Sequence, residues 1–420
     1  MFLMLQRCLL ILLFCSGAGR SLAQDITSPY SILGIGDIET KDYGKFFGMA
    51  STTLALRSAS FINLGNPASL TALDARMLNI DVNSRWRSSS FRYPISDSFS
   101  SSYNDAAIRR LSLTFRPSEG WGFSFGIKPY STVNYQIEEK LNLSSGGQTS
   151  INKKVTGSGG INQVYLANGF KISKNFSVGL TASYLFGSLT RNTLYTYENL
   201  GVNIARNEYE VLKGFQLQGG IQYTGKTGEH LSHTIGIVAS NPTKLKGSLE
   251  TEYSSKDSLL QSSSKDSKGF KLPLQLGIGY ALVIDDMITI AADYHRSDWE
   301  QRKLDYPNAY LHQAQRFSLG FQYVSQKQMQ GQMREKIFIQ AGVAYDQGYI
   351  AIKGQQINDL SATVGIGSNI SRLINVYLGL EVGSKGSTTK DQIRERYTQI
   401  STGITLKEFW HNTRKMRLYN

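Results

Sequence analysis

The stretch FSVGLTASYLFG at residues 176–187 alternates apolar side chains with small or polar ones. Successive side chains of a β-strand point to opposite faces, so this period of two predicts a strand with one apolar and one polar face. A helix would instead need apolar residues at intervals of three and four. The apolar members are Phe176, Val178, Leu180, Ala182, Tyr184 and Phe186, with Leu185 as the exception.

The same alternation recurs along most of the chain from about Leu78 onward. A soluble β-sandwich would alternate too, so strand length decides between the two classes. Many of the expected strands exceed 10 residues, whereas soluble strands cluster near 5 or 6 and a membrane strand needs about 9 to 11. Other alternating stretches lie at 121–128, 215–223, 274–282, 317–323 and 376–383.

The connections between the expected strands also alternate, in length. Tight connections are expected at 117–120, 173–174, 285 and 372, and long polar ones at 93–106, 254–266 and 305–312. Short turns at one end and long loops at the other are typical of outer-membrane barrels. We therefore predict an all-β protein, a transmembrane up-and-down antiparallel β-barrel of about 14 strands. A closed barrel leaves no backbone group unpaired in the hydrocarbon.

The first residues predict export. Arg7 precedes an apolar run from Leu9 to Phe14, and the small residues Ser21 and Ala23 flank Leu22, so residues 1–23 have the form of a cleavable signal peptide. A lipid anchor at Cys15 is the alternative, but the bulky Phe14 before it disfavours lipoprotein processing. The expected location is the bacterial outer membrane.

The composition excludes some kinds of site and partner. Both cysteines, Cys8 and Cys15, lie in the expected signal peptide, which leaves the mature chain without disulfides or thiolate ligands. The formal net charge of +13 falls to +11 when Arg7 and Arg20 are removed. A basic exported chain meets acidic lipid headgroups rather than nucleic acid, and most of these charges are expected on solvated loops. We expect outer-membrane lipids as partners and no cofactor.

Residues 24–76 break the pattern. They contain glycines, Asn66 and Pro67, without sustained alternation. Their length suits a hatch or plug folded into the mouth or lumen of a barrel at 77–410, and the alternative is a short periplasmic lead-in. Residues 411–420 form a short basic tail, expected to be a solvated end.

The polar faces of the strands give the one indication of a site. A barrel of this size leaves lumen space that side chains alone do not fill, so either the hatch or water and ligand must fill it. The candidate lumen-lining residues are Gln216, Gln218, Gln222, Gln340 and Glu381.

Three patterns that could carry catalysis or bind metal are weak. Ser124 lies in a G-x-S-x-G match, but within an alternating strand rather than the sharp turn that such a nucleophile requires. His230 and His233 have H-x-x-H spacing without a third ligand nearby, and His295 with Asp293 is a single histidine on a strand. We therefore expect no enzyme, no catalytic residue and no metal site.

Three short stretches resemble a known family. Residues 28–31 (SPYS) and 34–37 (GIGD) resemble the start of a group of outer-membrane proteins of Bacteroidetes, and residues 403–410 (GITLKEFW) are similar to its last strand. Residues 63–70 (NLGNPASL) resemble the element before the first strand of the OMPP1/FadL/TodX family of long-chain fatty acid transporters. The resemblance implies a 14-stranded barrel with an internal hatch. Only Asn66, Pro67 and Ala68 match the family's hatch element residue by residue.

The resemblance leaves more than one function open. Transporters of the family pass hydrophobic molecules through a lateral opening in the barrel wall, while Bacteroidetes relatives serve type IX secretion as a shuttle or as a plug against a large barrel. The leading expectation is FadL-like transport of hydrophobic compounds. The alternatives are a non-transporting accessory protein that binds a large secretion-system barrel, and a secreted β-sandwich adhesin.

Overall fold

The computed structural model describes residues 28–409, apart from 94–95, 144–148, 198–201, 256–257, 302, 305, 307, 330–331, 372 and 389–391. The expected signal peptide and the basic tail lie outside the described residues. No helix in the described part of the chain is both long and apolar enough to span a bilayer.

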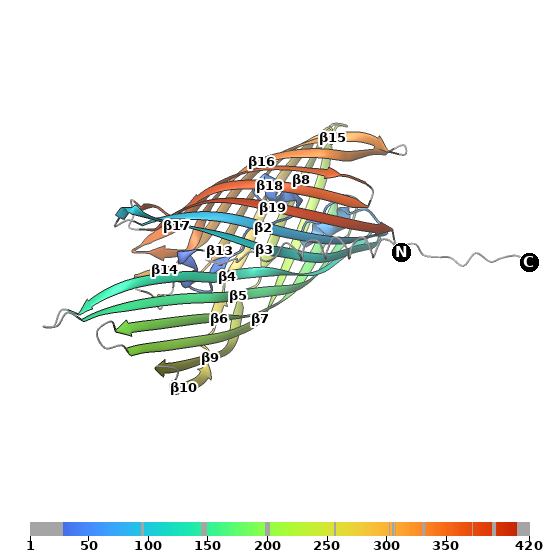
Figure 1. The fold of residues 1–420 in the computed structure, drawn as a ribbon. Coiled ribbons are helices and arrows are strands. Elements are labelled where there is room, and N and C mark those ends of the chain that lie inside the picture. The colour runs from blue at the N-terminus through green and yellow to red at the C-terminus, as the bar shows by residue number, and fades with distance from the viewer. Residues whose placement is uncertain are drawn as a thin grey trace, which may run out of the picture.

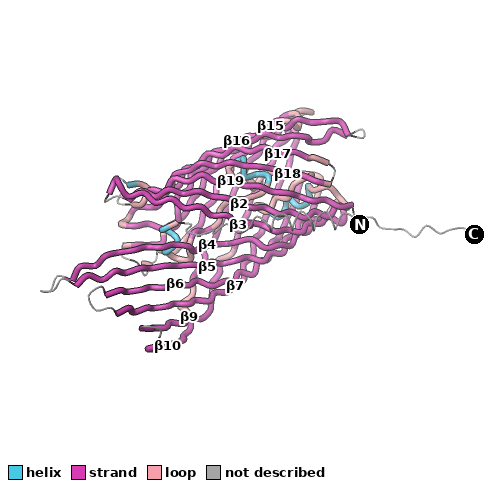
Figure 2. The backbone as a smooth tube through the Cα atoms, in the orientation of Figure 1, coloured by secondary structure: helices cyan, strands magenta, loops and turns pink. Residues whose placement is uncertain are grey.

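The wall is a closed antiparallel barrel of 14 strands, as the alternation predicts. Each strand pairs with its neighbours in sequence, and the last pairs with the first, Phe409 opposite Met77 (Figures 1 and 2). Two wall strands are interrupted and are counted here as one each, β8 with β9 and β10 with β11 and β12. The strands are β2 (Met77–Tyr93), β3 (Ser96–Ser118), β4 (Trp121–Leu143), β5 (Thr149–Lys171), β6 (Phe176–Tyr197), β7 (Val202–Thr227), β8 (Leu231–Ser240), β9 (Thr243–Ser255), β10 (Ser258–Asp266), β11 (Phe270–Leu272), β12 (Leu274–Ile284), β13 (Ile288–Asp298), β15 (Ala314–Met329), β16 (Gln332–Ile352), β17 (Gln355–Asn369), β18 (Ile374–Lys385) and β19 (Arg394–Phe409), while β14 (Ala309–Leu311) lies in a connection.

The two faces of the wall are inverted relative to a soluble protein. Large apolar side chains such as Phe215, Leu217 and Ile221 are exposed on the outside, whereas Gln216 and Gln222 are buried within. Lipid covers the outer face of such a barrel and leaves polar groups for the lumen. The two ends differ: tight turns such as Glu119–Gly120 and Asp285–Met287 define the turn end, and the opposite rim is the loop end.

Two of the expected long loops are wrong. Residues 96–106 belong to β3, and most of 254–266 is the hairpin of β9 and β10. These stretches are mostly polar because they extend past the lipid, where neither face has to be apolar, so the period of two disappears although the backbone remains paired. In the connection around 305–312, residues 309–311 form β14, and the other described residues are irregular.

Residues 28–76, here called the N-terminal segment, lie inside the barrel. Three short 3₁₀ helices, η1 (Pro29–Ile32), η2 (Lys45–Met49) and η3 (Pro67–Ala72), are joined by irregular chain and one short strand, β1 (Asp37–Ile38). Helix η3 begins as its sequence dictates, with Asn66 as N-cap accepting a hydrogen bond from the Ala68 amide and Pro67 in the first turn. Its side chains Leu70 and Leu73 pack with Tyr165 of the wall.

Candidate functional site: the seam between β3 and β4

The wall is unpaired along one line, between β3 and β4. Their pairing runs from the turn end only as far as Leu111 opposite Ile127. Beyond that point β4 stays paired with β5 up to Leu143, while no register pair joins it to β3 in the described part of the chain. Figure 1 shows β3 and β4 diverging toward the loop end. We call this unpaired stretch, residues 96–110 and 128–143, the seam.

The sequence of β4 contributes to the seam. Pro129 lies just beyond the last pair and has no amide hydrogen to donate, and the register with β5 shifts between Pro129 and Ser131. A proline inside a strand is tolerated at an edge or a bulge, and this position has both features.

The N-terminal segment occupies the edge of β4 that β3 leaves free. Strand β1 pairs with it, Asp37 opposite Thr132 and Ile38 opposite Ser131. The Glu39 amide donates to the Tyr130 carbonyl over 2.9 Å, and the Asn134 amide donates to the Ser31 hydroxyl over 3.0 Å. Backbone groups that would otherwise lack partners in the wall are thus satisfied from inside the barrel.

On the β3 side of the seam a β-bulge turns two consecutive arginines inward. Asn83 pairs with Arg110 and Ser84 with Ile108, so Arg109 is the extra residue. As a result Arg109 and Arg110 are both buried, which a regular strand would not allow. Arg109 also donates to the Thr132 hydroxyl across the seam, over 3.2 Å.

These cations face acidic groups of the N-terminal segment. The Glu39 carboxylate lies 3.6 Å from Arg109 and 3.8 Å from Arg85, and Arg110 pairs with both Asp42 and Asp81. Burial tends to raise the pKa of Glu39, but Arg109 and Arg85 outweigh it and hold that pKa below its ordinary value. Glu39 therefore stays ionised where it lies.

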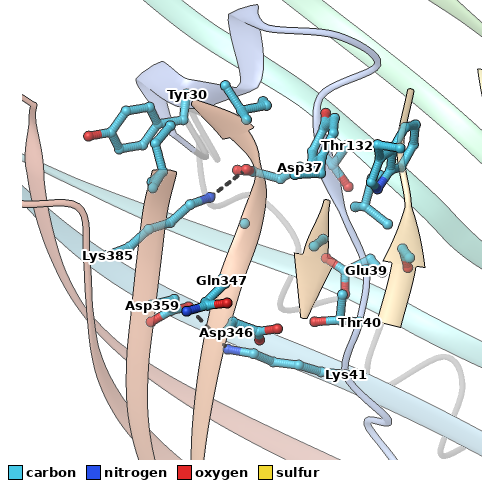
Figure 3. Close-up of a pocket in the computed structure, with 18 of the residues that line it drawn as sticks. Tyr30, Asp37, Glu39, Thr40, Lys41, Thr132, Asp346, Gln347, Asp359 and Lys385 are labelled. Carbon is cyan, nitrogen blue, oxygen red and sulfur yellow. Dashed lines mark hydrogen bonds and ion pairs between the residues drawn. The ribbon is translucent and has the colours of Figure 1, made fainter. Parts of the chain in front are cut away.

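A cavity of about 170 Å³ adjoins the seam (Figure 3). Asp37 forms an ion pair with Lys385 over 2.6 Å at this cavity, as Figure 3 shows. Lys41, which also lines the cavity, forms another with Glu381 over 2.6 Å. Burial lowers the pKa of Lys41, but Glu381 and its neighbours raise it well above the ordinary value. As it stands, the cavity has the size and lining to hold water or a small polar group.

A further ion pair fixes the segment toward the turn end. The Lys45 ammonium lies 2.5 Å from the Glu335 carboxylate, between the rings of Phe61 and Phe338 at 4.7 and 4.5 Å from their centroids. The carboxylate and the two aromatic faces together stabilise the buried ammonium, and few other side chains would fit between them.

The three residues of the expected hatch element lie against the turn-end part of β5, β6 and β7. Asn66 donates from its side-chain amide to the Ile221 carbonyl over 3.0 Å and to the Leu54 carbonyl over 3.0 Å, and Pro67 and Ala68 follow it into η3. A Cβ at Gly220 would lie 2.3 Å from the Asn66 side-chain oxygen, and one at Gly179 would lie 2.4 Å from the Pro67 carbonyl carbon. The wall admits this turn because two glycines leave room for it.

The five candidate lumen residues all point inward, and three of them form hydrogen bonds with the N-terminal segment. Gln222 donates to the Leu54 carbonyl and accepts from Arg57, and Gln218 donates to the Gly65 carbonyl. Gln340 donates to Gln322, Glu381 binds Lys41, and the buried side-chain amide nitrogen of Gln216 has no hydrogen-bond partner. Four of the five thus belong to the packing of the segment or the wall rather than to an open channel.

Sequence reasoning did not select the charged residues of the seam. Asp81, Arg85 and Arg110 occupy inward positions between apolar outward ones such as Val82 and Leu111, which is a detectable signal. The bulge at Arg109 is invisible to a strict period of two. The acidic partners Glu39 and Asp42 lie in irregular chain, where no pattern marks them.

The residues of the weak catalytic and metal-binding patterns do not come together in a site. Ser124 is buried in β4 and shares a hydrogen bond of 2.7 Å with Thr114. The two histidines have different partners: His230 contacts Asp285, and His233 contacts the Tyr280 hydroxyl. Within the described residues no group of three or more His, Cys, Asp or Glu side chains could hold a metal ion.

Solved structures share this architecture. A FadL homologue of Pseudomonas aeruginosa superposes with a TM-score of 0.62 at 10% identity, covering 90% of this chain and 100% of its own. The toluene transporter TodX of Pseudomonas putida gives 0.58 at 14% identity with 90% and 100% coverage, and the toluene transporter TbuX of Ralstonia pickettii gives 0.56 at 14% with 87% and 98%. Curated protein sequences include no match to this chain.

The fold and the inverted faces together define a transmembrane β-barrel of the outer-membrane type, with FadL-like architecture. Within that class the family is specific. The model of the BamG family matches residues 4–417, so the chain belongs to the BamG family.

Proposed function

We propose that this protein is an outer-membrane transporter of hydrophobic compounds whose passage leads through the seam, with the N-terminal segment as its gate. The observation that carries the proposal is the hydrogen bonding of β1 to the free edge of β4. A wall strand whose partner is a removable internal segment can open sideways into lipid without breaking the rest of the barrel.

One further observation supports a gate rather than a permanent channel. Opening would have to draw residues 28–39 out of a packed apolar cluster, in which Tyr30, Leu33 and Ile35 are buried, so the closed state is the stable one. The cavity beside the seam is lined by charged groups, so an apolar compound would enter only after β1 and its ion pairs move. The fold shared with toluene transporters of other bacteria makes monoaromatic compounds and long-chain fatty acids the first probes.

A disulfide across β1 and β4 tests the gate. Ile38 and Ser131 are register partners, and the only natural cysteines are Cys8 and Cys15. Oxidised Ile38→Cys/Ser131→Cys should lose uptake of labelled toluene or oleate by cells, and reductant should restore it. A matched pair, Thr224→Cys/Thr234→Cys, joins wall strands away from the segment and should leave uptake unchanged. Equal uptake by the oxidised and reduced seam variants would refute the gate, and no uptake by the unmodified protein would refute transport.

The second candidate function is an accessory protein that binds a large secretion-system barrel and transports nothing. The observation that favours it is a set of strands that project past the barrel at the loop end (Figure 1). Recovery of the protein from native membranes with one large barrel partner, and without bound hydrophobic ligand, would support this alternative over transport.

A further inference from the structure

The projecting strands form a sheet whose edge at β10 is unpaired. We call the loop-end parts of β4, β5, β6, β7, β9 and β10 the wing. On one side it is bounded by the seam, and on the other by β10, which pairs with β9 and with no other strand in the described part of the chain. The adjoining β11 is covered by the following connection, where Phe270 packs on Trp299, so the uncovered edge is that of β10 alone.

The edge of β10 lacks the protection that sheets normally carry. All nine residues from Ser258 to Asp266 are exposed, including Leu259 at 63% and Leu260 at 62%. Edge strands in stable proteins are usually short, charged, broken by proline or covered. Here the central residues are serines, no proline occurs, and charge appears only at Lys265 and Asp266 next to the barrel.

The position of β10 rules out lipid as its cover. The exposed apolar band of the neighbouring wall runs from Leu274 to Tyr280, and Asp266 lies eight residues before it along the chain. At about 3.3 Å per residue this is roughly 25 Å of chain, which at a strand tilt of about 40° places the start of β10 roughly 20 Å beyond that band along the membrane normal. In barrels of this type the loop end faces the exterior of the cell, so the edge is open to water and to other proteins.

The outer face beside the edge is acidic. Glu252 lies opposite Ser262 and Glu250 opposite Ser264, so both carboxylates share one face with Leu259 and Asp266. The neighbours of that face on β7 are Tyr209 and Asn207. Among the ion pairs of the described residues, neither glutamate has a cationic partner, so this acidic strip is uncompensated where an added strand would lie.

A second copy of the chain does not fit this edge. Two barrels in one membrane are related by an axis along the membrane normal, which leaves both copies of a strand rising in the same direction. With a strand tilt of about 40°, the two β10 strands would cross at roughly 80° and could not pair antiparallel.

We propose that the edge of β10 binds an extended basic segment of another protein by β-strand addition. Backbone hydrogen bonds to β10 would supply affinity, and alternate Lys or Arg side chains would lie over Glu250, Glu252 and Asp266, with an apolar side chain over Leu259. The inference does not depend on whether the barrel transports anything, because the wing lies outside the lumen.

Synthetic peptides test the recognition on the purified full-length protein in detergent. A labelled peptide of about ten residues with alternating threonine and lysine should bind about tenfold more tightly than the same peptide with glutamate for lysine. Glu250→Gln/Glu252→Gln should remove that preference. Equal binding of the two peptides would overturn the proposal.

Proline variants test backbone pairing. Neighbouring residues of a strand turn their amides to opposite sides, so one of Ser262→Pro and Ser263→Pro removes a donor from the free edge and the other removes a donor from the β9 ladder. The edge-facing variant should abolish binding of the lysine peptide while the barrel keeps its folded migration on unheated gels. Unchanged binding by both variants would overturn strand addition.

A photo-crosslinker at Ser264, in cells that produce the protein natively, identifies the occupant. Ser248 is the matched control, because it is exposed on the same face of the sheet one strand away from the edge. The expected result is an adduct at Ser264 that contains a basic peptide, is reduced at Ser248 and is lost with the edge-facing proline. An acidic captured peptide, a second copy of this chain, or equal capture at both positions would overturn the proposal.

Discussion

Asn66 of the N-terminal segment donates a hydrogen bond to the Ile221 carbonyl of the barrel wall, although 155 residues separate the two in sequence. The same side chain caps η3 through its oxygen and binds the Leu54 carbonyl, so one amide satisfies the wall, the helix and the segment together. This contact lies on β7, three strands along the wall from β4. The second half of the segment is therefore anchored at η3, while its first half lies against β4 and buries Tyr30, Leu33 and Ile35.

Substitution of Asn66 should release this anchor. Asn66→Ala removes a helix cap and leaves the buried Leu54 carbonyl without this donor, which should cost about 1–2 kcal/mol of stability. Denaturant unfolding in detergent, followed by the gel shift of the folded barrel and by limited proteolysis of residues 28–76, measures the effect. Asn66→Asp keeps the cap but not the amide donors, so its stability should lie between that of the wild type and that of Asn66→Ala. An alanine variant as stable as the wild type would contradict the anchor.

Two adjacent glycines of β7 provide a matched test of the same contact. A Cβ at Gly220 would lie 2.3 Å from the Asn66 oxygen, whereas one at Gly219 meets nothing within 4 Å. Gly220→Ala should therefore displace the segment at a cost of about 1–3 kcal/mol, and Gly219→Ala should not. Protease cleavage of the N-terminal segment reports the displacement. Equal cleavage of the two variants would show that the close approach does not hold the segment.

The buried pair of Lys45 and Glu335 should show strong coupling. Lys45→Met leaves the Glu335 carboxylate without its cation, at an expected cost of about 3 kcal/mol. The double variant Lys45→Met/Glu335→Gln removes the unpaired charge and should recover part of that loss, since the methionine can still fill the space between Phe61 and Phe338. Unfolding of the four proteins forms a double-mutant cycle, and additive losses would mean that the pair does not interact.

The wall was predictable because contact with lipid constrains the sequence of a membrane strand. At positions such as Leu276 and Ile278, lipid requires an apolar side chain on every second residue, and the alternation gives both the strands and their number. Where β3 and β10 extend into water, that requirement ends, and runs such as Ser262–Ser264 resemble loops although they pair as strands. The alternation therefore indicates which part of a strand contacts lipid, and not how far the strand extends.

The site was much less predictable, because it consists of relationships between distant residues. The seam is an absence of pairing that only Pro129 hints at, and Lys45 finds Glu335 from 290 residues away. The glutamines face inward, but their partners in the N-terminal segment have no periodic signal. Sequence therefore indicated where a lumen lies and not what occupies it.

Acid should loosen the first half of the N-terminal segment. Burial tends to raise the pKa of Glu39, but Arg109 and Arg85 outweigh it, so folding lowers that pKa below its ordinary value of about 4.5. A group whose pKa is lowered by folding binds fewer protons in the folded state, so its stabilisation is complete above about pH 4.5 and is lost as the pH falls through the lower, folded pKa. Proteolysis of residues 28–39 by an acid-active protease should therefore rise as the pH falls below that value. Glu39→Gln should be cleaved faster at neutral pH and depend less on pH over the same range. If this variant instead kept the wild-type pH profile, another carboxylate would have to hold β1 against β4.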